Sequence, residues 1–439
     1  MEFLSRAILT RSESTQILCE MSQIDESTLD IQQTEDGVLG RLFVFSSTSP
    51  QTAISIKKYE DVTVGRGNAN TYQLIQSTAS YRHFRVYSVL VDDDMDPLVY
   101  CQDLSSNGTF LNHCLIGKGN VVLLSDGDIL DVRHCASFLY QQKNITDDDY
   151  HHEYDGEEFS ITHRLLGTGG FSRIYMAIEN KTGRQYACKI IEKRKVSSSR
   201  FYDDHEVSIL KKLNHPNIVH VAMDYNSESQ FFIFEELVTG GDLFSYLTKM
   251  GTVPEVTCLF IMYQLLQALG YLHSQNIAHR DLKLENILIV SSSDSVFRII
   301  LTDFGVARCM ENGKRMSTFV GTMEYTAPEV RDLKGRSRRC KELNMGYGKE
   351  VDIWSLGIIM YLLLSGNSPV FSTDGNIVFE DAIWKTISRQ AKDLISSFLQ
   401  KIPTERPTVE EALQHPWFFR HKSRLDKLYR TRILKRPSL

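Results

Sequence analysis

The pattern of hydrophobic and polar positions predicts a β-rich first third of the chain. From Gly40 to about Tyr140, short runs rich in β-branched and aromatic residues are separated by turns of Gly, Asn and Asp. The predicted strands cover residues 42–45, 62–64, 84–91, 99–103 and 128–132. Short strands at this spacing are typical of an all-β sandwich, so two packed sheets are expected here.

From about residue 159 the pattern changes to one that mixes strands and helices. Strand-like runs flank the glycine-rich segment 166–174, and another covers 186–191. Glu206 then opens a helix whose apolar positions are Val207, Ile209, Leu210 and Leu213. A chain of 439 residues is too long for one core and suits two domains with tails.

Polar residues in this second part follow the order that phosphoryl transfer from ATP to a protein hydroxyl requires. The motifs are the run from His279 to Asn286, then Asp303-Phe304-Gly305, then Ala327-Pro328-Glu329. Asp281 can accept the hydroxyl proton, and Lys283 can contact the transferring phosphate. Asn286 and Asp303 can hold Mg²⁺. A lone His-Arg-Asp is usually a solvated loop, but no common structural motif imitates the ordered set.

Two further parts of a nucleotide site precede these motifs. Backbone without side chains in the glycine-rich segment 166–174 can approach the ATP phosphates closely. Lys189, in the strand-like run, and Glu206, on the helix that follows, are expected to form an ion pair. The chain lacks the Gly-x-x-x-x-Gly-Lys-Ser/Thr phosphate loop, which excludes the corresponding nucleotide triphosphatases.

With these motifs, residues 159–419 resemble a eukaryotic serine/threonine protein kinase, nearest to the calcium/calmodulin-kinase group. The resemblance implies an α+β bilobal fold, with a strand-rich small lobe over about 159–234, a hinge at 235–238, and ATP and Mg²⁺ in the cleft. It also implies that Glu329 pairs with Arg406 and that the helix at 352–357 lies under the catalytic loop. The implied catalytic residues are Lys189, Glu206, Asp281, Lys283 and Asn286, and the implied metal ligands are Asn286 and Asp303. The implied nucleotide contacts are Leu166, Gly167, Thr168, Gly169, Gly170, Phe171, Ser172, Arg173, Ile174, Lys189, Glu236, Val238, Asn286 and Asp303.

Three features depart from the family pattern. Ser172 replaces the third glycine of the phosphate turn, a substitution familiar in the calmodulin-kinase group, so ATP binding is still expected. Glu235 occupies the gatekeeper position, where an apolar residue is usual, which changes the polarity expected of the adenine pocket. Residues 331–346 form a longer and basic connection, for which a solvated loop is the default interpretation.

Turns in the first third hold polar residues that can converge on a phosphate. They are Gly65-Arg66, the run from Ser80 to His83, the run from Ser105 to Thr109, and Asn112. An arginine, a serine hydroxyl and an Asn/Ser turn at one end of a sandwich can bind phosphate with charge-assisted hydrogen bonds.

This series resembles the forkhead-associated (FHA) domain, a phosphothreonine-binding module, over roughly residues 41–140. The resemblance implies that Arg66 and Ser80 bind the phosphate, that Ser106 and Asn107 hold the peptide, and that His83 braces the loops from within. Tyr81 stands where several relatives have Asn, so that secondary peptide contact differs here.

Charge and composition exclude several classes of protein. The net charge of −6 argues against a generic nucleic-acid binder, and no direct nucleic-acid binding is expected. The first residues lack the long apolar core of a signal peptide, and the best apolar run, 356–364, is too short to span a bilayer. An intracellular protein without a membrane partner is therefore expected. The eight cysteines are scattered without paired metal spacing, so reduced thiols are expected.

Three segments are expected to lie outside the two domains. Residues 1–40 are rich in Ser, Thr, Gln and Glu and predict a disordered regulatory N-terminus. Residues 141–158 are acidic and unpatterned and predict a linker. The basic residues crowded into 420–439 have three interpretations: a nuclear-import signal, a helix that packs on the kinase, or a solvated tail.

An FHA domain followed by a calmodulin-group kinase resembles the checkpoint effector kinases of the DNA-damage response, including their fungal meiotic relatives. The resemblance implies a nuclear location, phosphothreonine-containing partners and an upstream DNA-damage-responsive kinase. Two alternatives are a calcium/calmodulin-regulated kinase and a catalytically dead phosphopeptide scaffold. The presence of Lys189, Asp281, Asn286 and Asp303 argues against the scaffold.

The activation segment between Asp303 and Glu329 holds two candidate phosphosites. Thr318 is expected to be the main one, because a phosphate there can pair with Arg280 beside Asp281. Thr322, by family position, is expected to use its hydroxyl to hydrogen-bond the catalytic loop.

Two expectations concern partners. Thr15, followed by Gln16, is expected to be phosphorylated and to bind Arg66, Ser80 and Asn107 of a second copy, which would allow Thr318 to be phosphorylated in trans. Val306 after Asp-Phe-Gly predicts threonine acceptors, and the acidic residues Glu236, Asp242 and Glu285 predict a basic residue before the acceptor. The expected substrate pattern is Arg-x-x-Thr.

Overall fold

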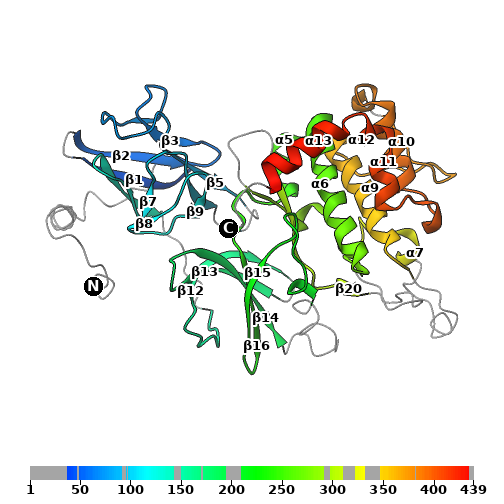
Figure 1. Ribbon diagram of the computed structural model, residues 1–439, viewed down its shortest axis with the longest axis horizontal. Coiled ribbons are helices and arrows are strands. Elements are labelled where there is room, and N and C mark those ends of the chain that lie inside the picture. The colour runs from blue at the N-terminus through cyan, green and yellow to red at the C-terminus, as the bar shows by residue number, and fades with distance from the viewer. Residues whose placement is uncertain are drawn as a thin grey trace. The chain divides into compact units, whose positions relative to one another are not determined.

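The computed structural model in Figure 1 describes residues 37–46, 49–90, 95, 97–142, 150–169, 172–193, 209–290, 297–309, 322–331, 347–380 and 382–434. The chain divides into two compact units. The first consists of residues 1–89 and 96–146, and the second of residues 90–95 and 147–439.

The first unit consists of two β-sheets. One has the strand order β2-β1-β11-β10-β7-β8, and the other the order β4-β3-β5-β6-β9. The strands of the first sheet are β1 Val38–Ser46, β2 Ser49–Lys57, β7 Phe110–Leu111, β8 Cys114–Leu115, β10 Ile129–Val132 and β11 Ala136–Gln142. Those of the second are β3 Val62–Gly65, β4 Tyr72–Gln73, β5 Phe84–Val89, β6 Leu98–Asp103 and β9 Val121–Leu123.

The core of this unit forms where the two sheets face each other. Alternate residues of β1, Leu42 and Val44, point inward and are buried, as period-2 patterning requires. Phe84 of β5 meets Phe138 of β11 edge to face, with ring centroids 5.2 Å apart. The predicted all-β sandwich is therefore confirmed. The strand predicted at 84–91 ends at Val89, and the structure adds β2 and β11, which the sequence pattern did not single out.

The second unit begins with an antiparallel sheet of strand order β12-β13-β14-β16-β15, which is the predicted small lobe. Its strands are β12 Phe159–Thr168, β13 Ser172–Glu179, β14 Gln185–Glu192, β15 Val221–Asn226 and β16 Gln230–Glu236. The middle of β16 consists of three Phe and one Ile, and all seven residues of the strand are buried, as expected of a strand inside the sheet.

The large lobe is mostly helical and confirms the α+β bilobal prediction. Its helices are α5 Leu243–Met250, α6 Glu255–Ser274, α7 Pro328–Arg331, α9 Glu350–Ser365, α10 Arg389–Phe398, α11 Val409–Gln414, α12 Pro416–Phe419 and α13 Lys422–Tyr429. Short 3₁₀ turns are η2 Leu284–Asn286, η3 Ala382–Lys385 and η4 Pro403–Glu405, and η5 Arg430–Leu434 is a π-helical turn. Short strands are β17 Ile277–Ala278, β18 Ile287–Val290, β19 Arg298–Leu301 and β20 Arg308–Cys309.

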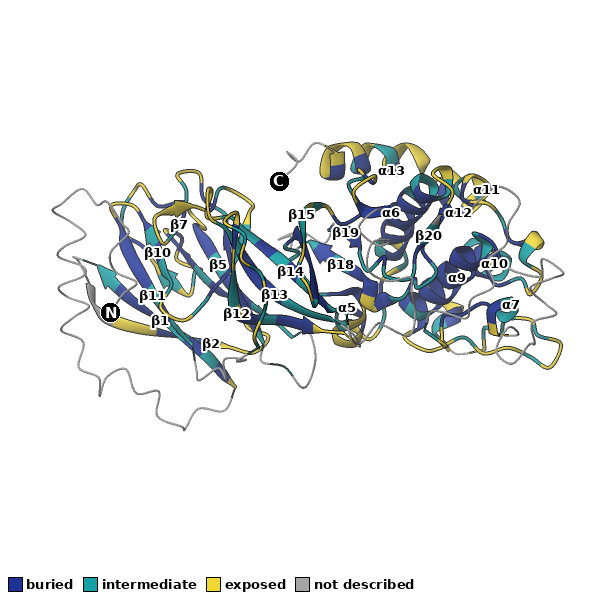
Figure 2. Ribbon diagram, turned by 90° about the horizontal axis from the view of Figure 1, so that it is seen from below, coloured by how far each residue is buried: buried dark blue, intermediate teal, exposed yellow. Residues whose placement is uncertain are grey.

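Helices α6 and α9 form the centre of this lobe and are buried over most of their length (Figure 2). Helix α6 is long and apolar enough to cross a membrane, but 67% of its apolar window is buried inside the lobe. Its composition is therefore explained by its place in the core. Helix α9 ends at Gly366, whose φ of 72° is the left-handed conformation that favours glycine.

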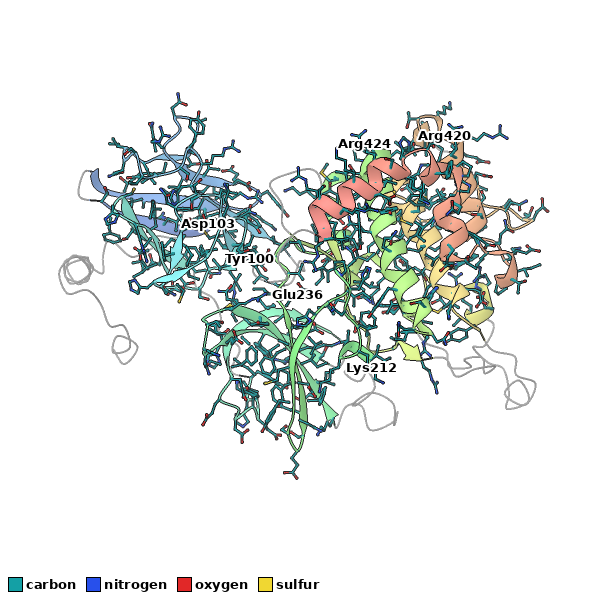
Figure 3. The ribbon with its side chains drawn as sticks, in the orientation of Figure 1. Tyr100, Asp103, Lys212, Glu236, Arg420 and Arg424 are labelled. Atoms are coloured by element: carbon teal, nitrogen blue, oxygen red, sulfur yellow. The ribbon has the colours of Figure 1, made fainter. Side chains whose placement is uncertain are left out.

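The basic tail folds as a helix on the large lobe over its described part, residues 420–434. Leu425, Tyr429 and Ile433 are buried in the core cluster of the lobe. Arg420 and Arg424 are exposed and lie at the outer edge of the lobe (Figure 3). Of the three interpretations of this segment, the packed helix is confirmed for 420–434.

Candidate functional site

The carboxylate of Asp281 is the centre of a hydrogen-bonded cluster formed by the catalytic loop and the activation segment. Its Oδ1 accepts hydrogen bonds from the backbone N and the Oγ1 of Thr322, at 2.8 and 3.0 Å. Its Oδ2 lies 2.9 Å from Lys283 Nζ and accepts a hydrogen bond from Asn286 Nδ2 at 3.2 Å. The structure therefore brings together the three residues predicted to transfer a proton, contact the phosphate and bind metal.

Thr322 makes the contact with the catalytic loop that was expected from its position in the sequence. Its hydroxyl donates to Asp281 and accepts a hydrogen bond from Lys283 Nζ at 3.1 Å. A phosphate on this oxygen would face the Asp281 carboxylate and meet charge repulsion. These contacts favour Thr322 as a hydrogen-bonding hydroxyl over its other predicted use as a phosphosite. Thr318 lies outside the described residues.

A buried carboxylate below the loop, Asp352 on α9, sets the loop's backbone. Its Oδ2 accepts from the backbone N of His279 at 3.0 Å, and its Oδ1 accepts from the backbone N of Arg280 at 2.9 Å. Burial alone would raise the pKa of Asp352, but the hydrogen bond and charge of His273, together with His279 and the Arg280 amide, lower it overall. The family resemblance implies this helix under the loop, but the role of its carboxylate became visible only in the structure.

Lys189 and Asp303 form an ion pair between the two lobes. Lys189 Nζ on β14 lies 3.0 Å from Asp303 Oδ1. The charge of Lys189 is the main reason that the pKa of Asp303 is lowered to about 2. Glu206, the predicted partner of Lys189, lies outside the described residues.

The donor set around Asp303 fits Mg²⁺. Asp303 is ionised at neutral pH, and Asn286 uses its amide nitrogen as a donor to Asp281, which leaves the amide oxygen as a ligand. Carboxylate and amide oxygens are the ligands that Mg²⁺ takes. When bound with ATP, Mg²⁺ neutralises charge on the phosphates. Among the described residues there is no cluster of three His, Cys, Asp or Glu side chains that would form a protein-only metal site.

The predicted phosphate turn lies between β12 and β13. The backbone N of Gly169 donates to the carbonyl of Ser172 at 2.8 Å, which closes the hairpin. Ile174 pairs with Gly167 on one side and with Lys189 on the other. The turn is therefore held directly beside the strand that carries the lysine. Gly170 and Phe171 lie outside the described residues, and Leu166 is buried at the end of β12.

Two glutamates end β16, where the hinge begins, and the structure gives them different surroundings. Glu235 is buried, and its charge adds to the burial that raises the pKa of the Cys188 thiol. Glu236 is also buried, and its Oε1 accepts from the backbone N of His220 at 3.1 Å and lies 3.7 Å from Arg298. Glu236 is therefore unable to bind a substrate peptide as predicted, because its carboxylate is held inside the protein. Val238 lies two residues after Glu236, in the connection between the lobes.

The predicted pair of Glu329 with Arg406 is present in the structure. Arg406 donates to both oxygens of Glu329, at 2.7 and 2.8 Å, in the two-point geometry that guanidinium and carboxylate groups favour. Arg406 also donates to the backbone carbonyls of Glu350 and Gln400. This anchors the end of the activation segment to α9 and the segment after α10.

In the first unit, the loops that carry the predicted phosphate-binding residues come together. The backbone N of Arg66 donates to the carbonyl of Ser80 at 2.9 Å, and the backbone N of Ser106 donates to Ser80 Oγ at 3.0 Å. Asn107 Nδ2 donates to the carbonyl of Thr78 at 2.7 Å. Because Ser80 Oγ accepts from Ser106, its proton is left to donate to a phosphate oxygen. Arg66, Ser106 and Asn107 are exposed beside it.

His83 braces these loops from below, as predicted. It is buried, its Nδ1 accepts from the backbone N of Ser80 at 3.1 Å, and its Nε2 lies 3.2 Å from the carbonyl of Gly108. Burial is the main reason that its pKa is lowered. A neutral ring protonated at Nε2 satisfies both contacts.

Asp103, which was not among the predicted site residues, organises the Asn/Ser turn. Its buried carboxylate accepts hydrogen bonds from the backbone N of Ser105, at 2.8 Å, and from the backbone N and hydroxyl of Thr109, at 3.1 and 2.9 Å. Figure 3 shows Asp103 among the strands of the sandwich. An Asp at the end of a predicted strand, before a Ser-rich turn, was the available signal.

Family models for two domains match the chain. The protein kinase domain model matches residues 160–418, and the FHA domain model matches residues 62–133.

Two curated relatives and one solved structure illustrate the similarity. The chain is 73% identical over 439 residues to the meiosis-specific serine/threonine-protein kinase mek1 of Schizosaccharomyces pombe, a match that covers 99% of this chain and 98% of the relative. It is 33% identical to the meiosis-specific serine/threonine-protein kinase MEK1 of Saccharomyces cerevisiae, over 88% of this chain and 86% of the relative. The crystal structure of Rad53 1-466 in complex with AMP-PNP is similar over 87% of this chain and 100% of that chain, with 31% identity and a TM-score of 0.48.

Proposed function

The chain belongs to the protein kinase family and carries an FHA domain ahead of its kinase domain, and from that premise we propose that it is a meiosis-specific serine/threonine kinase of a recombination or DNA-damage checkpoint. The observation that carries the proposal is 73% identity over nearly the whole chain to a relative that is named as a meiosis-specific kinase. The cluster around Asp281 supplies the chemistry.

In the proposed reaction, the residues of this chain orient the substrate hydroxyl and hold the phosphates. Asp281 accepts the hydroxyl proton, and Lys283, 2.9 Å from it, stabilises charge on the transferring phosphate. Lys189 binds the nucleotide phosphates, and Asp303 and Asn286 hold Mg²⁺. Most of the rate comes from this positioning and electrostatic stabilisation.

The assignment of the catalytic residues is tested by Lys189→Arg and Asp303→Asn. Each is expected to lower peptide phosphorylation by about two orders of magnitude or more, because each removes a group that stabilises the transferring phosphate. Phosphothreonine-peptide binding should stay at the wild-type level, because Arg66 and Ser80 belong to the other unit. Activity within a few-fold of the wild-type value would overturn the assignment.

Substrate choice is proposed to favour Arg-x-x-Thr. Of the three predicted acids, Glu285 is exposed on η2, whereas Asp242 is buried and its carboxylate caps α5. The Glu285 carboxylate can therefore bind an arginine before the acceptor. A peptide array should show more phosphate transfer to Arg-x-x-Thr than to Arg-x-x-Ser or Ala-x-x-Thr peptides, and a preference for serine would contradict the assignment.

We further propose that the FHA unit recruits and pairs the kinase. A DNA-damage-responsive kinase would phosphorylate Thr15, and the phosphothreonine would dock on Arg66, Ser80 and Asn107 of a second copy. The kinase units would then phosphorylate Thr318 in trans, and the new phosphate would pair with Arg280. Thr15 and Thr318 both lie outside the described residues, so the support comes from the sequence and from the geometry of the FHA loops.

Location in the nucleus and independence from calmodulin complete the proposal. Although the tail is packed as a helix, Arg420 and Arg424 are exposed (Figure 3), so their basic side chains are available to an import receptor. The apolar side of that helix is buried in the large lobe through Leu425, Tyr429 and Ile433, which leaves it covered rather than available to calmodulin. Activation by calcium and calmodulin would favour the alternative, a calmodulin-regulated kinase.

A further inference from the structure

Residues 150–158, expected to be part of a linker, lie across the outer face of the small-lobe sheet. We call this segment the strap. It has no regular secondary structure, but its aromatic side chains join the apolar cluster on that face of the sheet. Tyr154 packs against Phe234 and Phe232, with ring centroids 5.1 and 5.7 Å apart. The strap is therefore part of the kinase unit, which includes residues 147–439.

The two acidic residues of the strap, Glu153 and Asp155, contact β15 and the turn between β15 and β16. The Glu153 carboxylate accepts hydrogen bonds from the hydroxyl of Ser227 at 2.7 Å, and from the backbone N and hydroxyl of Ser229 at 3.0 and 2.5 Å. These bonds lower the pKa of Glu153 to about 2. Asp155 accepts a hydrogen bond from Tyr225 on β15. β15 is one edge strand of the sheet and β12 is the other. The contacts of Glu153 and Asp155 therefore lie on the opposite side of the sheet from the phosphate turn between β12 and β13.

Tyr150, the first described residue of the strap, contacts β13, which follows the phosphate turn, β14, which carries Lys189, and the first residue of β16. The ring of Tyr150 stacks on Tyr175 of β13, with centroids 5.7 Å apart and planes at 11°. The guanidinium of Arg173, also on β13, lies 4.6 Å from the centroid of the Tyr150 ring. The Tyr150 hydroxyl donates to Glu192 at the end of β14 and accepts from Gln230 Nε2 at 3.0 Å.

These contacts place the strap one residue from the phosphate turn. Arg173 follows Ser172, whose carbonyl accepts the hydrogen bond from Gly169 that closes the turn. Arg173 pairs with Ile190 of the outer-face cluster, whereas the next residue, Ile174, pairs with Lys189 on the opposite face of the sheet. Glu192 lies on the same strand as Lys189. Contacts on the outer face of the sheet therefore fix the positions of β13 and β14. The inner face of these two strands is the side that meets the nucleotide.

We propose that Tyr150 is a positioning residue for ATP binding: its ring holds the guanidinium of Arg173, and through it the start of β13, in the position from which β13 and the neighbouring Lys189 strand meet the nucleotide. The inference rests on the protein kinase activity of the chain. A glycine-rich turn has little side-chain packing of its own, so support must come from the strands that flank it. In this protein the strap supplies that support from a segment N-terminal to the first strand of the lobe.

The test uses the full-length protein with Tyr150→Ala, Tyr150→Phe and Arg173→Ala. Tyr150→Ala is expected to raise the KM for ATP about three- to tenfold with kcat within twofold of wild type, because the lost contact has the size of one cation–π interaction. Tyr150→Phe keeps the ring over Arg173 and should restore the wild-type KM. Arg173→Ala should raise the KM as Tyr150→Ala does, and the double variant should be no worse than either single variant.

The matched control is Glu153→Ala, which removes the strap's hydrogen bonds to the β15–β16 turn. It is expected to lower the unfolding temperature of the kinase unit but to leave the KM for ATP unchanged. The idea is overturned if Tyr150→Ala has the wild-type KM, or if Glu153→Ala raises the KM as much as Tyr150→Ala does, since the strap would then act only through stability.

Direct titration with a fluorescent ATP analogue separates this inference from the activity on which it rests. Tyr150→Ala should weaken analogue binding by the same factor as it raises the KM. If the wild-type protein bound the analogue but phosphorylated no peptide, the kinase function would fail, and the titration would still decide the role of Tyr150. Equal analogue affinities for wild type and Tyr150→Ala would refute that role.

Discussion

At the scale of single residues, the site depends on backbone conformations that side chains from elsewhere hold in place. Arg280 and Asp303 have φ angles of 72° and 61°, in the left-handed region that non-glycine residues rarely adopt. Such conformations cost of order 1–3 kcal/mol each and persist only where surrounding contacts fix them. Asp352 holds the amide of Arg280, and the carbonyl of Thr302, next to Asp303, lies 3.1 Å from the ring of His279.

His83 gives a pH prediction at the same scale. Its folded pKa lies below the ordinary value of about 6.5, because burial disfavours the charged ring. The unfolded chain therefore binds more protons below pH 6.5, and the stability that the neutral ring provides is present above that pH and lost as pH falls toward the folded pKa. NMR titration of the ring should give a midpoint below 6.5, and unfolding of the FHA unit should become easier from pH 7 to pH 5.5.

A midpoint for His83 above 6.5 would mean that the ring is charged in the fold, and the hydrogen bond from Ser80 N to Nδ1 would then be wrong.

At the scale of elements, helix α13 closes a polar network inside the large lobe. The Tyr429 hydroxyl donates to Oδ1 of Asn217 at 2.7 Å, and Asn217 is fully buried. Asn217 Nδ2 donates to the carbonyl of Ile299 at 2.7 Å, and the backbone N of Leu301 donates to the carbonyl of Asn217 at 2.9 Å. The tail helix is thereby tied to β19, the strand that leads to Asp303.

Tyr429→Phe is expected to destabilise the kinase unit by about 1–3 kcal/mol, the cost of leaving a buried polar atom without its hydrogen bond. Calorimetry of the full-length protein can measure this in the transition that Mg-ATP shifts to higher temperature. Tyr271→Phe is the matched control, because its hydroxyl accepts from the exposed backbone N of Asn214, which water can satisfy instead. The control should change stability by about 0.5 kcal/mol or less. Equal effects of the two substitutions would show that Asn217 does not depend on the tail.

At the scale of the whole molecule, two units with separate cores divide the chemistry: one binds phosphothreonine and the other transfers phosphate. The sandwich and the kinase unit each have their own buried cluster. Docking of Thr15 of one copy on the FHA unit of another would raise the effective concentration of one kinase beside its neighbour without any contact between kinase surfaces.

Full-length protein phosphorylated at Thr15 is therefore expected to dimerise at micromolar concentration, as measured by size-exclusion chromatography with light scattering. Phosphatase treatment should return it to the monomer. Arg66→Ala should abolish the dimer, because it removes the charged donor to the phosphate. Lys58→Ala, which removes an exposed positive charge after β2, serves as the control and should still dimerise. A phosphorylated protein that stays monomeric, or an Arg66→Ala variant that dimerises like wild type, would disprove the mechanism.

The catalytic motifs could be predicted because phosphoryl transfer restricts residue types at fixed spacings. Asp281, Lys283 and Asn286 lie within six residues of one another, so a local loop is enough to bring them together, and the structure does so. The FHA residues were predictable for a related reason. Arg66, Ser80 and Ser106 lie in turns whose Gly, Asn and Ser content marks one end of a sandwich, and the loops meet there.

Only the tertiary structure decided the contacts between residues far apart in the chain, because the local sequence pattern carries no information about them. The sequence pattern of residues 150–158 is polar and acidic, yet Tyr150 and Tyr154 pack on the sheet because β13 and β16 present aromatic surface there. Glu236 looks like any exposed acid in the sequence, but His220 and Arg298 enclose it. The motif residues followed from the sequence itself because their chemistry is local. The residues that hold them, such as Asp352 and Asp103, emerged only when the burial of each carboxylate and its backbone partners could be seen together.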